Sequence, residues 1–151
     1  MKNYVLGLFC GLIFNLYGQE KPSPYGAVTN FFNAFHAKDS IAMQSIFHQK
    51  ARLLRSGNRN GQPVISENDL QLFIRSVSTR PNSPVWEERL GDPIVQQNQD
   101  LATVWVPFHF YLDEQLSHCG FNSFTLVWNG SSWKILSLID TATKECDLIP
   151  I

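Results

Sequence analysis

The stretch Leu101–Thr141, LATVWVPFHFYLDEQLSHCGFNSFTLVWNGSSWKILSLIDT, decides the fold of this chain. Apolar and polar residues alternate along it with a period of two, which is typical of strands that bury one face. The pattern predicts strands at Leu101–Leu112, His118–Trp128 and Trp133–Thr141. Because only short turns separate them, we expect an antiparallel meander.

One more strand is predicted before this stretch, at Trp86–Gln97, and Gly91–Pro93 interrupts it. Glycine and proline inside a strand pattern indicate a bulge or bend, which lets a sheet curl. A curled sheet has a concave face, so the sequence predicts a wall that can border a hollow.

The register of the last hairpin can be predicted from its aromatic residues. Placing Trp128 opposite Trp133 across the turn makes an aromatic cross-strand pair, and counting back puts Phe121 opposite Asp140. The same counting through the preceding turn places His109 near Phe121. A slip of one residue would reverse the face of every side chain.

The residues before the meander are predicted to form helices that close the hollow. Phenylalanines at helical spacing predict an amphipathic helix over Tyr25–Ala37. Asp39 is suited to cap a short second helix, and Ser66 with Asp69 resembles a capping box at the start of a third. Each helix would bury one apolar stripe.

A short strand at Ala51–Ser56 is expected between the second and third helices, followed by a loop at Gly57–Pro63. With 151 residues, 44% of them hydrophobic, the chain is long enough for one substantial core. The predicted fold class is therefore α+β: a single domain whose cone-shaped, curved antiparallel sheet encloses N-terminal helices.

The charge balance argues against two classes of partner. The chain carries 12 basic and 13 acidic residues, so its formal net charge is -1. Nucleic acids and anionic membranes attract clustered basic surfaces. We therefore expect no nucleic-acid partner and no anionic membrane partner.

The first residues follow the pattern of an export signal: Lys2 is basic, Tyr4–Tyr17 is mostly apolar, and small Gly18 precedes polar residues. An uncleaved membrane anchor is the alternative, but the apolar run is shorter than the roughly 20 residues that span a bilayer. We expect a cleaved signal peptide at 1–18, a polar linker at 19–24 and a domain at 25–151. The mature chain would be periplasmic or secreted, without stable membrane insertion.

Removal of the signal would leave two cysteines, Cys119 and Cys146. In an oxidising compartment an even pair predicts a disulfide. Two separately buried thiols are the alternative.

The two faces of the strand Leu101–Leu112 differ in composition, because successive side chains point to opposite faces. One face resembles a core and carries Val104, Val106, Phe108 and Phe110. The other mixes aromatic and polar groups and carries Trp105, His109 and Tyr111. That mixture is typical of a ligand cavity and equally of an amphipathic dimer surface.

The order of elements resembles the nuclear-transport-factor-2-like superfamily, which includes steroid isomerase-like and polyketide cyclase-like (SnoaL-like) proteins. The resemblance is carried by the segment VTNFFNAFHAKD at Val28–Asp39, by Trp133–Ile135 after a polar turn, and by Ile139–Thr141. These segments look like those of exported bacterial members described as lumazine-binding-like. The resemblance implies a cone with an internal pocket and frequent homodimers, and it transfers no activity.

Acid–base chemistry in such a pocket needs a base and a hydrogen-bond donor for developing charge. Asp140 and His109 are the candidate catalytic residues, and Tyr111 is the candidate donor. With Trp105 they form the predicted ligand-binding set. The alternative gives them structural roles: a strand-end cap for Asp140, a satisfied hydrogen bond for His109 and edge packing for Tyr111.

The remaining motifs predict neither a metal site nor a cofactor. The four histidines lack the paired spacing of common zinc sites, and no phosphate-binding loop is present in the sequence. The leading hypothesis is an exported domain that binds a small hydrophobic or aromatic ligand. A cofactor-independent isomerase, dehydratase or cyclase and a noncatalytic protein-interaction module are the alternatives.

Overall fold

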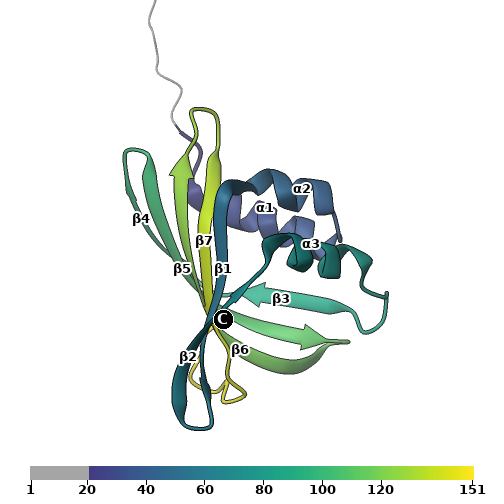
Figure 1. Ribbon diagram of the computed structural model, residues 1–151. Coiled ribbons are helices and arrows are strands. Elements are labelled where there is room, and N and C mark those ends of the chain that lie inside the picture. Colours follow the sequence, from purple (N-terminus) through teal and green to yellow (C-terminus); the bar gives the residue numbers. More distant parts are fainter. Residues whose placement is uncertain (1–20) are drawn as a thin grey trace, which may run out of the picture.

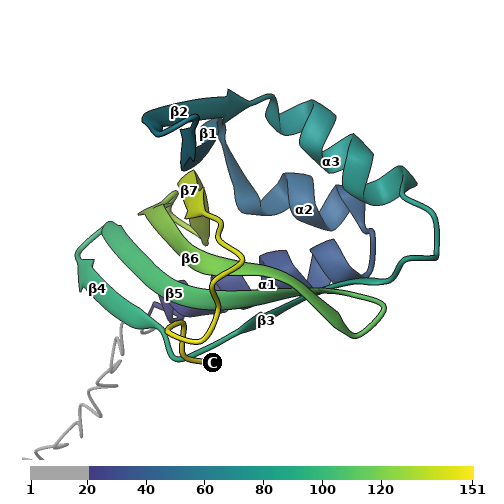
Figure 2. The same ribbon diagram turned by 90° about the horizontal axis from the view of Figure 1, so that it is seen from below.

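The computed structural model describes residues 21–151; the predicted signal peptide and its cleavage point after Gly18 lie outside the described residues. Within the described part, helices lie on one side of a strongly curved sheet (Figures 1 and 2). The elements in chain order are α1 Pro24–His36, α2 Ser40–Ile46, β1 Phe47–Arg59, β2 Gln62–Asn68, α3 Leu70–Thr79, β3 Trp86–Leu90, β4 Ile94–Asn98, β5 Leu101–Leu112, β6 Gln115–Trp128 and β7 Trp133–Thr141.

The strands form one sheet in the order β2-β1-β7-β6-β5-β3, and β4 also pairs with β5. All pairings are antiparallel except that of β1 with β7, which is parallel. The sheet is therefore mixed and not wholly antiparallel as predicted. No hairpin turn dictates the direction of β7 relative to β1, because the whole β3–β6 segment lies between them in sequence. The α+β class and the curved sheet are confirmed.

The predicted interruption at Gly91–Pro93 divides one edge strand into β3 and β4. β3 pairs with one end of β5 and β4 with the other, and the Gly91 N–H donates to the Pro107 carbonyl at 3.0 Å. A Cβ on Gly91 would lie 2.7 Å from the carbonyl oxygen of Pro150. This position therefore requires glycine.

The core lies between α1 and the concave face of the sheet. The helix buries its phenylalanine stripe, and the Phe31 ring packs against Phe47 of β1 and Phe124 of β6 with centroid separations of 5.4 and 6.3 Å. Full burial of one such ring stabilises the fold by about 1.5–3 kcal/mol. These contacts hold the helix against the sheet.

The helix caps agree only in part with the predictions. Asp39 accepts a hydrogen bond from the Ala42 N–H at 2.9 Å, which confirms it as the N-cap of α2. Asp69 itself caps α3 and accepts from the Leu72 N–H at 2.8 Å. The predicted capping box is wrong, because Ser66 still belongs to β2.

The predicted loop Gly57–Pro63 is also wrong, because β1 and β2 continue into a hairpin. They are joined by Asn60 and Gly61, whose φ angles are 53° and 79°. Asn-Gly suits a two-residue hairpin turn that needs positive φ at both positions. The residues that suggested an irregular loop therefore make a tight turn.

The register of the last hairpin departs from the prediction by one residue. The tryptophan pair Trp128–Trp133 is confirmed, but Asp140 pairs with Asn122 and not with Phe121. Leu136 is a bulged residue, since its two neighbours in β7 pair with consecutive residues of β6. The bulge reverses the alternation and turns Asp140 to the concave face.

The preceding turn is tighter than predicted. β5 ends at Leu112 and β6 begins at Gln115, so only Asp113 and Glu114 connect them, both with positive φ. As a result His109 pairs with Cys119 and not with Phe121.

The C-terminal segment is fastened to the outer face of the sheet. Cys119 and Cys146 form the predicted disulfide, with their Cα atoms 5.7 Å apart. Backbone hydrogen bonds of 2.9 and 2.8 Å also join Cys119 to Thr143. Between residues 21 and 151 no helix has the length and apolar character to cross a membrane.

Candidate functional site

A cavity of about 900 Å³ lies between the concave face of the sheet and helices α1 and α3. Its volume falls within the range of small-molecule sites. Aromatic rings make up much of its wall: Phe31, Phe32, Phe35, Phe73, Trp86, Phe108 and Phe110. The polar residues that line it include Arg55, Glu88, His118, Asn122 and Asp140, which we call the polar floor.

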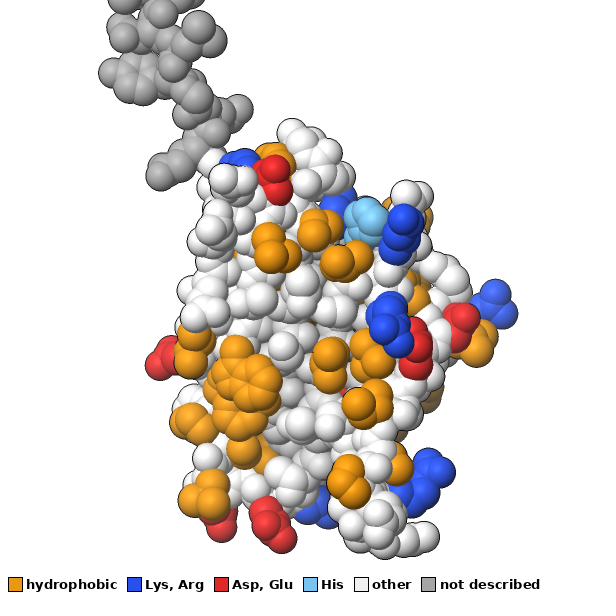
Figure 3. All heavy atoms as spheres, turned by 60° about the vertical axis from the view of Figure 1, so that its left-hand side comes forward, with side chains coloured by type: hydrophobic (Ala, Val, Ile, Leu, Met, Phe, Trp, Pro, Cys, Tyr) orange, Lys and Arg blue, Asp and Glu red, His pale blue; other side chains and the backbone are white. Residues whose placement is uncertain are grey.

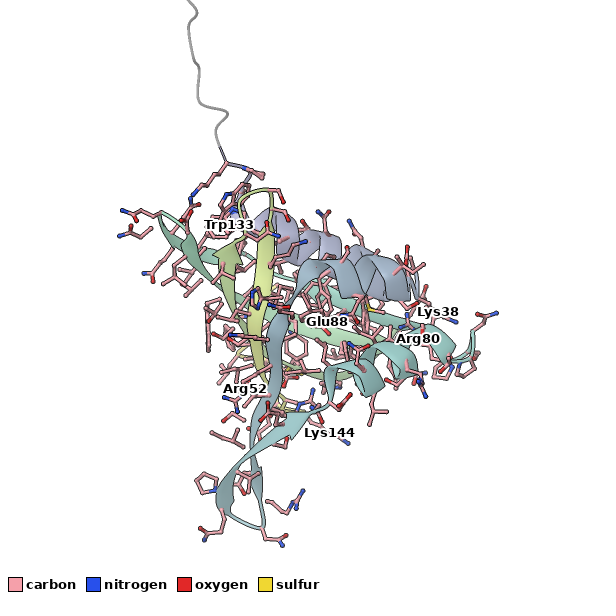
Figure 4. The ribbon with its side chains drawn as sticks, turned by 45° about the horizontal axis from the view of Figure 1, so that its top comes forward. Lys38, Arg52, Arg80, Glu88, Trp133 and Lys144 are labelled. Carbon is pink, nitrogen blue, oxygen red and sulfur yellow. A yellow bond between two sulfur atoms is a disulfide. The ribbon has the colours of Figure 1, made fainter. Side chains whose placement is uncertain are left out.

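Glu88 is the most perturbed acid of the polar floor. It enters the interior from β3, between the helices and the sheet (Figure 4). The side-chain amide of Asn122 donates a hydrogen bond of 2.7 Å to Oε1 of Glu88. Burial raises the pKa of Glu88 to about 7, although the hydrogen bond from Asn122 acts in the opposite direction. Near neutral pH, Glu88 is therefore populated in both its protonated and its ionised form.

The backbone of Glu88 is tied to the end of α1. Its N–H donates to Nε2 of His36 at 2.9 Å, so this nitrogen carries no proton. Burial lowers the pKa of His36, which favours the neutral ring that this contact requires. The contact fixes β3 against the helix.

Arg55 and Asp140 form an ion pair across the paired strands β1 and β7. Nε of Arg55 donates to both carboxylate oxygens at 3.0 Å, and Nη2 donates as well. The hydrogen bond to Asp140 raises the pKa of Arg55. The Asp140 side chain is 16% exposed and that of Arg55 is 48% exposed, so the pair lies at the boundary between cavity and solvent.

His118 contributes a polar ring to the wall from β6. It stacks on Phe110 with centroids 4.8 Å apart, and its Nδ1 lies 3.2 Å from the Ser117 hydroxyl. Burial, and then the positive charge of Arg55, lower the pKa of His118. The ring is therefore neutral at physiological pH.

The polar floor combines two carboxylates with one guanidinium. Its formal charge is one unit negative when Glu88 is ionised and zero when Glu88 is protonated. This arrangement can hydrogen-bond a polar group, balance a positive charge or move a proton. Among residues 21–151, no three His, Cys, Asp or Glu side chains are grouped as ligands of a metal ion.

Of the predicted site residues, Asp140 lines the cavity, and Trp105, His109 and Tyr111 lie on the opposite face of β5. Nε2 of His109 donates to the Ile149 carbonyl at 3.0 Å, beneath the C-terminal segment. The structure thus does not bring these three residues together with Asp140.

The other two side chains of this face have partners of their own. Trp105 stacks on Phe121 with centroids 5.0 Å apart, and the Arg89 guanidinium lies 4.1 Å from the centroid of the Tyr111 ring. The cavity wall is formed instead by the other face of β5, which the sequence pattern indicated as core. The cavity is largely apolar, so its lining has the composition of a core. Phe108 and Phe110 of that face line it.

The predicted site set does not include Arg55, Glu88, His118 or Asn122; for Arg55 the sequence favours a surface role. A signal for Glu88 was present: it shares a strand face with Trp86 and Leu90, so a charged residue interrupts an apolar alternation. An acid at an inward-facing position is a candidate functional group.

The curved sheet, the helices over its concave face and the cavity between them define the nuclear-transport-factor-2-like (NTF2-like) fold. An NTF2-like protein of unknown function from Shewanella baltica is 11% identical, with a TM-score of 0.59 over 81% of this chain and 92% of that chain. An NTF2-like protein from Cytophaga hutchinsonii is 15% identical, with a TM-score of 0.58 over 79% and 94%.

A proposed dehydratase of the NTF2-like family from Streptomyces avermitilis is 16% identical, with a TM-score of 0.57 over 79% of this chain and 92% of that chain. No protein-family model matches the sequence, and no curated protein matches it. Similarity at this level of identity shows the fold and transfers no activity.

Proposed function

We propose that this protein binds a small, largely apolar molecule in the cavity and directs the molecule's polar group to the polar floor. The observation that carries this proposal is the division of the cavity into aromatic walls and one cluster of polar residues that includes Glu88, Asn122 and Asp140. Apolar walls supply affinity, and a few placed polar groups fix orientation.

A cavity-blocking variant tests this binding function. Ser76 and its neighbour Arg75 are both exposed on α3, but only Ser76 belongs to the cavity lining. We expect Ser76→Trp to abolish binding of the apolar dye Nile red, measured by fluorescence, and Arg75→Trp to leave it unchanged. Equal dye binding by both variants, or no binding by the unmodified protein, would contradict the proposal.

A second candidate function is a cofactor-independent isomerase, dehydratase or cyclase in which Glu88 moves a proton. It is supported by the pKa of Glu88, about 7, because a general acid or base works best when its pKa is near the working pH. Both carboxylate oxygens of Asp140 accept hydrogen bonds from Arg55, and Asp140 would act as the charge partner of Arg55.

Proton exchange separates this candidate from binding alone. We expect the protein to speed deuterium uptake at the carbon next to the carbonyl of cyclic ketones in D₂O, followed by NMR, and Glu88→Gln to remove the effect. Equal exchange rates with both proteins would leave binding as the function.

Export is also part of the proposed function. The apolar N-terminal run favours it, and so does the Cys119–Cys146 disulfide, since such bonds persist in oxidising compartments. After expression of the full chain in bacteria, mass spectrometry of the periplasmic fraction should find a protein that begins at Gln19. Full-length protein confined to the cytoplasm would contradict export.

The outer face of the sheet supports pairing with a second copy of this chain. Ile94, Trp105 and Ile139 are 63%, 44% and 39% exposed, and with Phe121 they make an outer patch (Figure 3). Cross-strand pairing places Ile94 beside Trp105. Exposed apolar patches mark interaction sites.

Sedimentation analysis tests the proposed homodimer. We expect Trp105→Glu to make the protein monomeric and Ile41→Glu, on an 83% exposed position of α2, to leave the dimer intact. A monomeric unmodified protein would favour a different protein partner for the outer patch.

A further inference from the structure

The carboxylate of Glu88 has one oxygen open to the cavity. Oε1 accepts the hydrogen bond from Asn122, and Oε2 has no hydrogen-bond partner within residues 21–151. No side-chain oxygen or nitrogen of the described part is both unpartnered and sealed from accessible space. Since Glu88 lines the cavity, Oε2 opens onto it.

The positive charge of Arg55 attracts the Glu88 carboxylate, but within residues 21–151 no cationic side chain donates a hydrogen bond to it. Arg55 from β1 donates through Nε and Nη2 to Asp140 of β7. His118 from β6 and His36 from α1 are neutral, because burial lowers the pKa of both. An ionised Glu88 is therefore a negative charge in a largely apolar cavity, and the nearest guanidinium, that of Arg55, is hydrogen-bonded to Asp140 instead.

Aromatic residues are the neighbours of Glu88 in the sheet. Trp86 precedes Glu88 by two residues on the same strand face, and Phe110 is its cross-strand partner in β5. The Trp86 and Phe110 ring centroids are 5.9 Å apart. Aromatic faces attract cations, and the Arg80 guanidinium already lies 5.2 Å from the Trp86 ring centroid. The remaining aromatic wall and the carboxylate favour the same kind of group.

We propose that the ligand of this cavity is an aromatic or apolar amine, bound as an ammonium ion that donates to Oε2 of Glu88 and contacts the surrounding rings. This inference rests on the proposed binding function and names the chemical class of its ligand. The ammonium completes the charge balance of the polar floor, which two carboxylates and one guanidinium leave negative.

The sign of the pH dependence distinguishes an amine from a neutral ligand. An ammonium binds the ionised carboxylate, so it lowers the pKa of Glu88, releases a proton on binding and binds more tightly as pH rises through about 7. A neutral ligand that accepts a hydrogen bond from protonated Glu88 would bind more weakly over the same range.

Three probes with one indole skeleton test the proposal: tryptamine, tryptophol and indole-3-acetate, measured by isothermal titration calorimetry at pH 6 and pH 8. We expect tryptamine at pH 8 to bind about 10- to 100-fold more tightly than tryptophol, because only tryptamine can donate a charge-assisted hydrogen bond to Glu88. Tryptamine affinity should rise from pH 6 to pH 8, and buffers of different ionisation enthalpy should report proton release.

Two variants test whether the preference for tryptamine depends on Glu88. Glu88→Gln should bring tryptamine affinity down to that of tryptophol and remove its pH dependence while retaining tryptophol binding. Glu87→Gln is the matched control, because Glu87, the preceding residue, lies on the outer strand face and pairs with Arg89 at 2.7 Å. It should bind all three probes like the unmodified protein.

Several results would overturn the amine proposal and leave the binding function standing: tryptophol or indole-3-acetate binding as tightly as tryptamine, tryptamine affinity that is flat or falling from pH 6 to pH 8, or Nile red binding without tryptamine binding. Absence of binding for Nile red and all three probes would overturn both. The pH series on the unmodified protein decides the question even if Glu88→Gln is unstable.

Discussion

Asn122 donates its side-chain amide to Glu88 at 2.7 Å while its backbone position pairs with Asp140, so one residue of β6 links the two acids of the polar floor. Asn122 is only 3% exposed. A buried polar residue needs a partner, and Glu88 is that partner.

Replacing Asn122 with leucine should raise the pKa of Glu88 above about 7. The hydrogen bond favours the ionised carboxylate, and its loss leaves burial unopposed. Carboxyl NMR titration measures the change. Ser123→Ala, on the opposite strand face, is the control, and an unchanged or lowered pKa in Asn122→Leu would contradict the assignment.

Glu88 should make the free energy of unfolding fall as pH rises. Its pKa is about 7 in the folded protein against an ordinary 4.5, so the folded state holds the proton more tightly between these values. The contribution of Glu88 to the free energy of unfolding is greatest below about pH 4.5. It falls by about 3 kcal/mol as the pH rises to about 7. Urea unfolding of Glu88→Gln across the same range should lack this decline; an equal decline would assign it to other groups.

The two members of the ion pair should shift the pKa of Glu88 in opposite directions. Asp140 raises that pKa by repulsion and Arg55 lowers it by attraction. Asp140→Asn is therefore expected to lower the pKa of Glu88, and Arg55→Met to raise it. Shifts of the same sign in NMR titrations of the two variants would mean that the pair acts through structure and not through charge.

The period-two pattern was enough to predict the strands and their curvature, but not which face borders the cavity. The bulge at Leu136 explains why the predicted position of Asp140 was wrong. A strict count puts Asp140 opposite Phe121 on the outer face, and the one extra residue turns its side chain inward. Ile135, Leu136, Leu138 and Ile139 of β7 are all aliphatic, so the sequence fits either alternation and does not reveal the bulge.

The other site residues were missed because their roles depend on contacts between distant segments. Arg55 and Asp140 are 85 residues apart, and Asn122 and Glu88 are 34 apart. The apolar face of β5 was interpreted as core because phenylalanines that line a cavity and phenylalanines that fill a core have the same pattern.

Gly120 and Gly26 should respond differently to alanine. A Cβ on Gly120 would lie 2.1 Å from the backbone oxygen of Thr141, so Gly120→Ala must move a strand and is expected to cost at least about 2 kcal/mol. Gly26 in α1 has nothing within 4 Å of its Cβ position, and Gly26→Ala should stabilise by up to about 1 kcal/mol. Thermal unfolding compares them, and similar effects would contradict the close approach.

Removing the disulfide should lower stability without altering the cavity. The bond closes a sequence separation of 27 residues, and the variant with Cys119→Ala and Cys146→Ala is expected to lose about 2–4 kcal/mol in urea unfolding. Nile red binding should persist, since neither cysteine lines the cavity. Two free thiols in the unmodified, exported protein, detected by nonreducing mass analysis, would show that the bond does not form.

The fastened C-terminal segment also determines what an attached group can sense. Ile151 packs against Gly91, and Pro107, beside the outer patch, packs against the same glycine. A fluorophore or fused domain joined after Ile151 would therefore emerge on the convex side of the sheet. It would report on events at that surface and remain shielded by the sheet from anything entering the cavity.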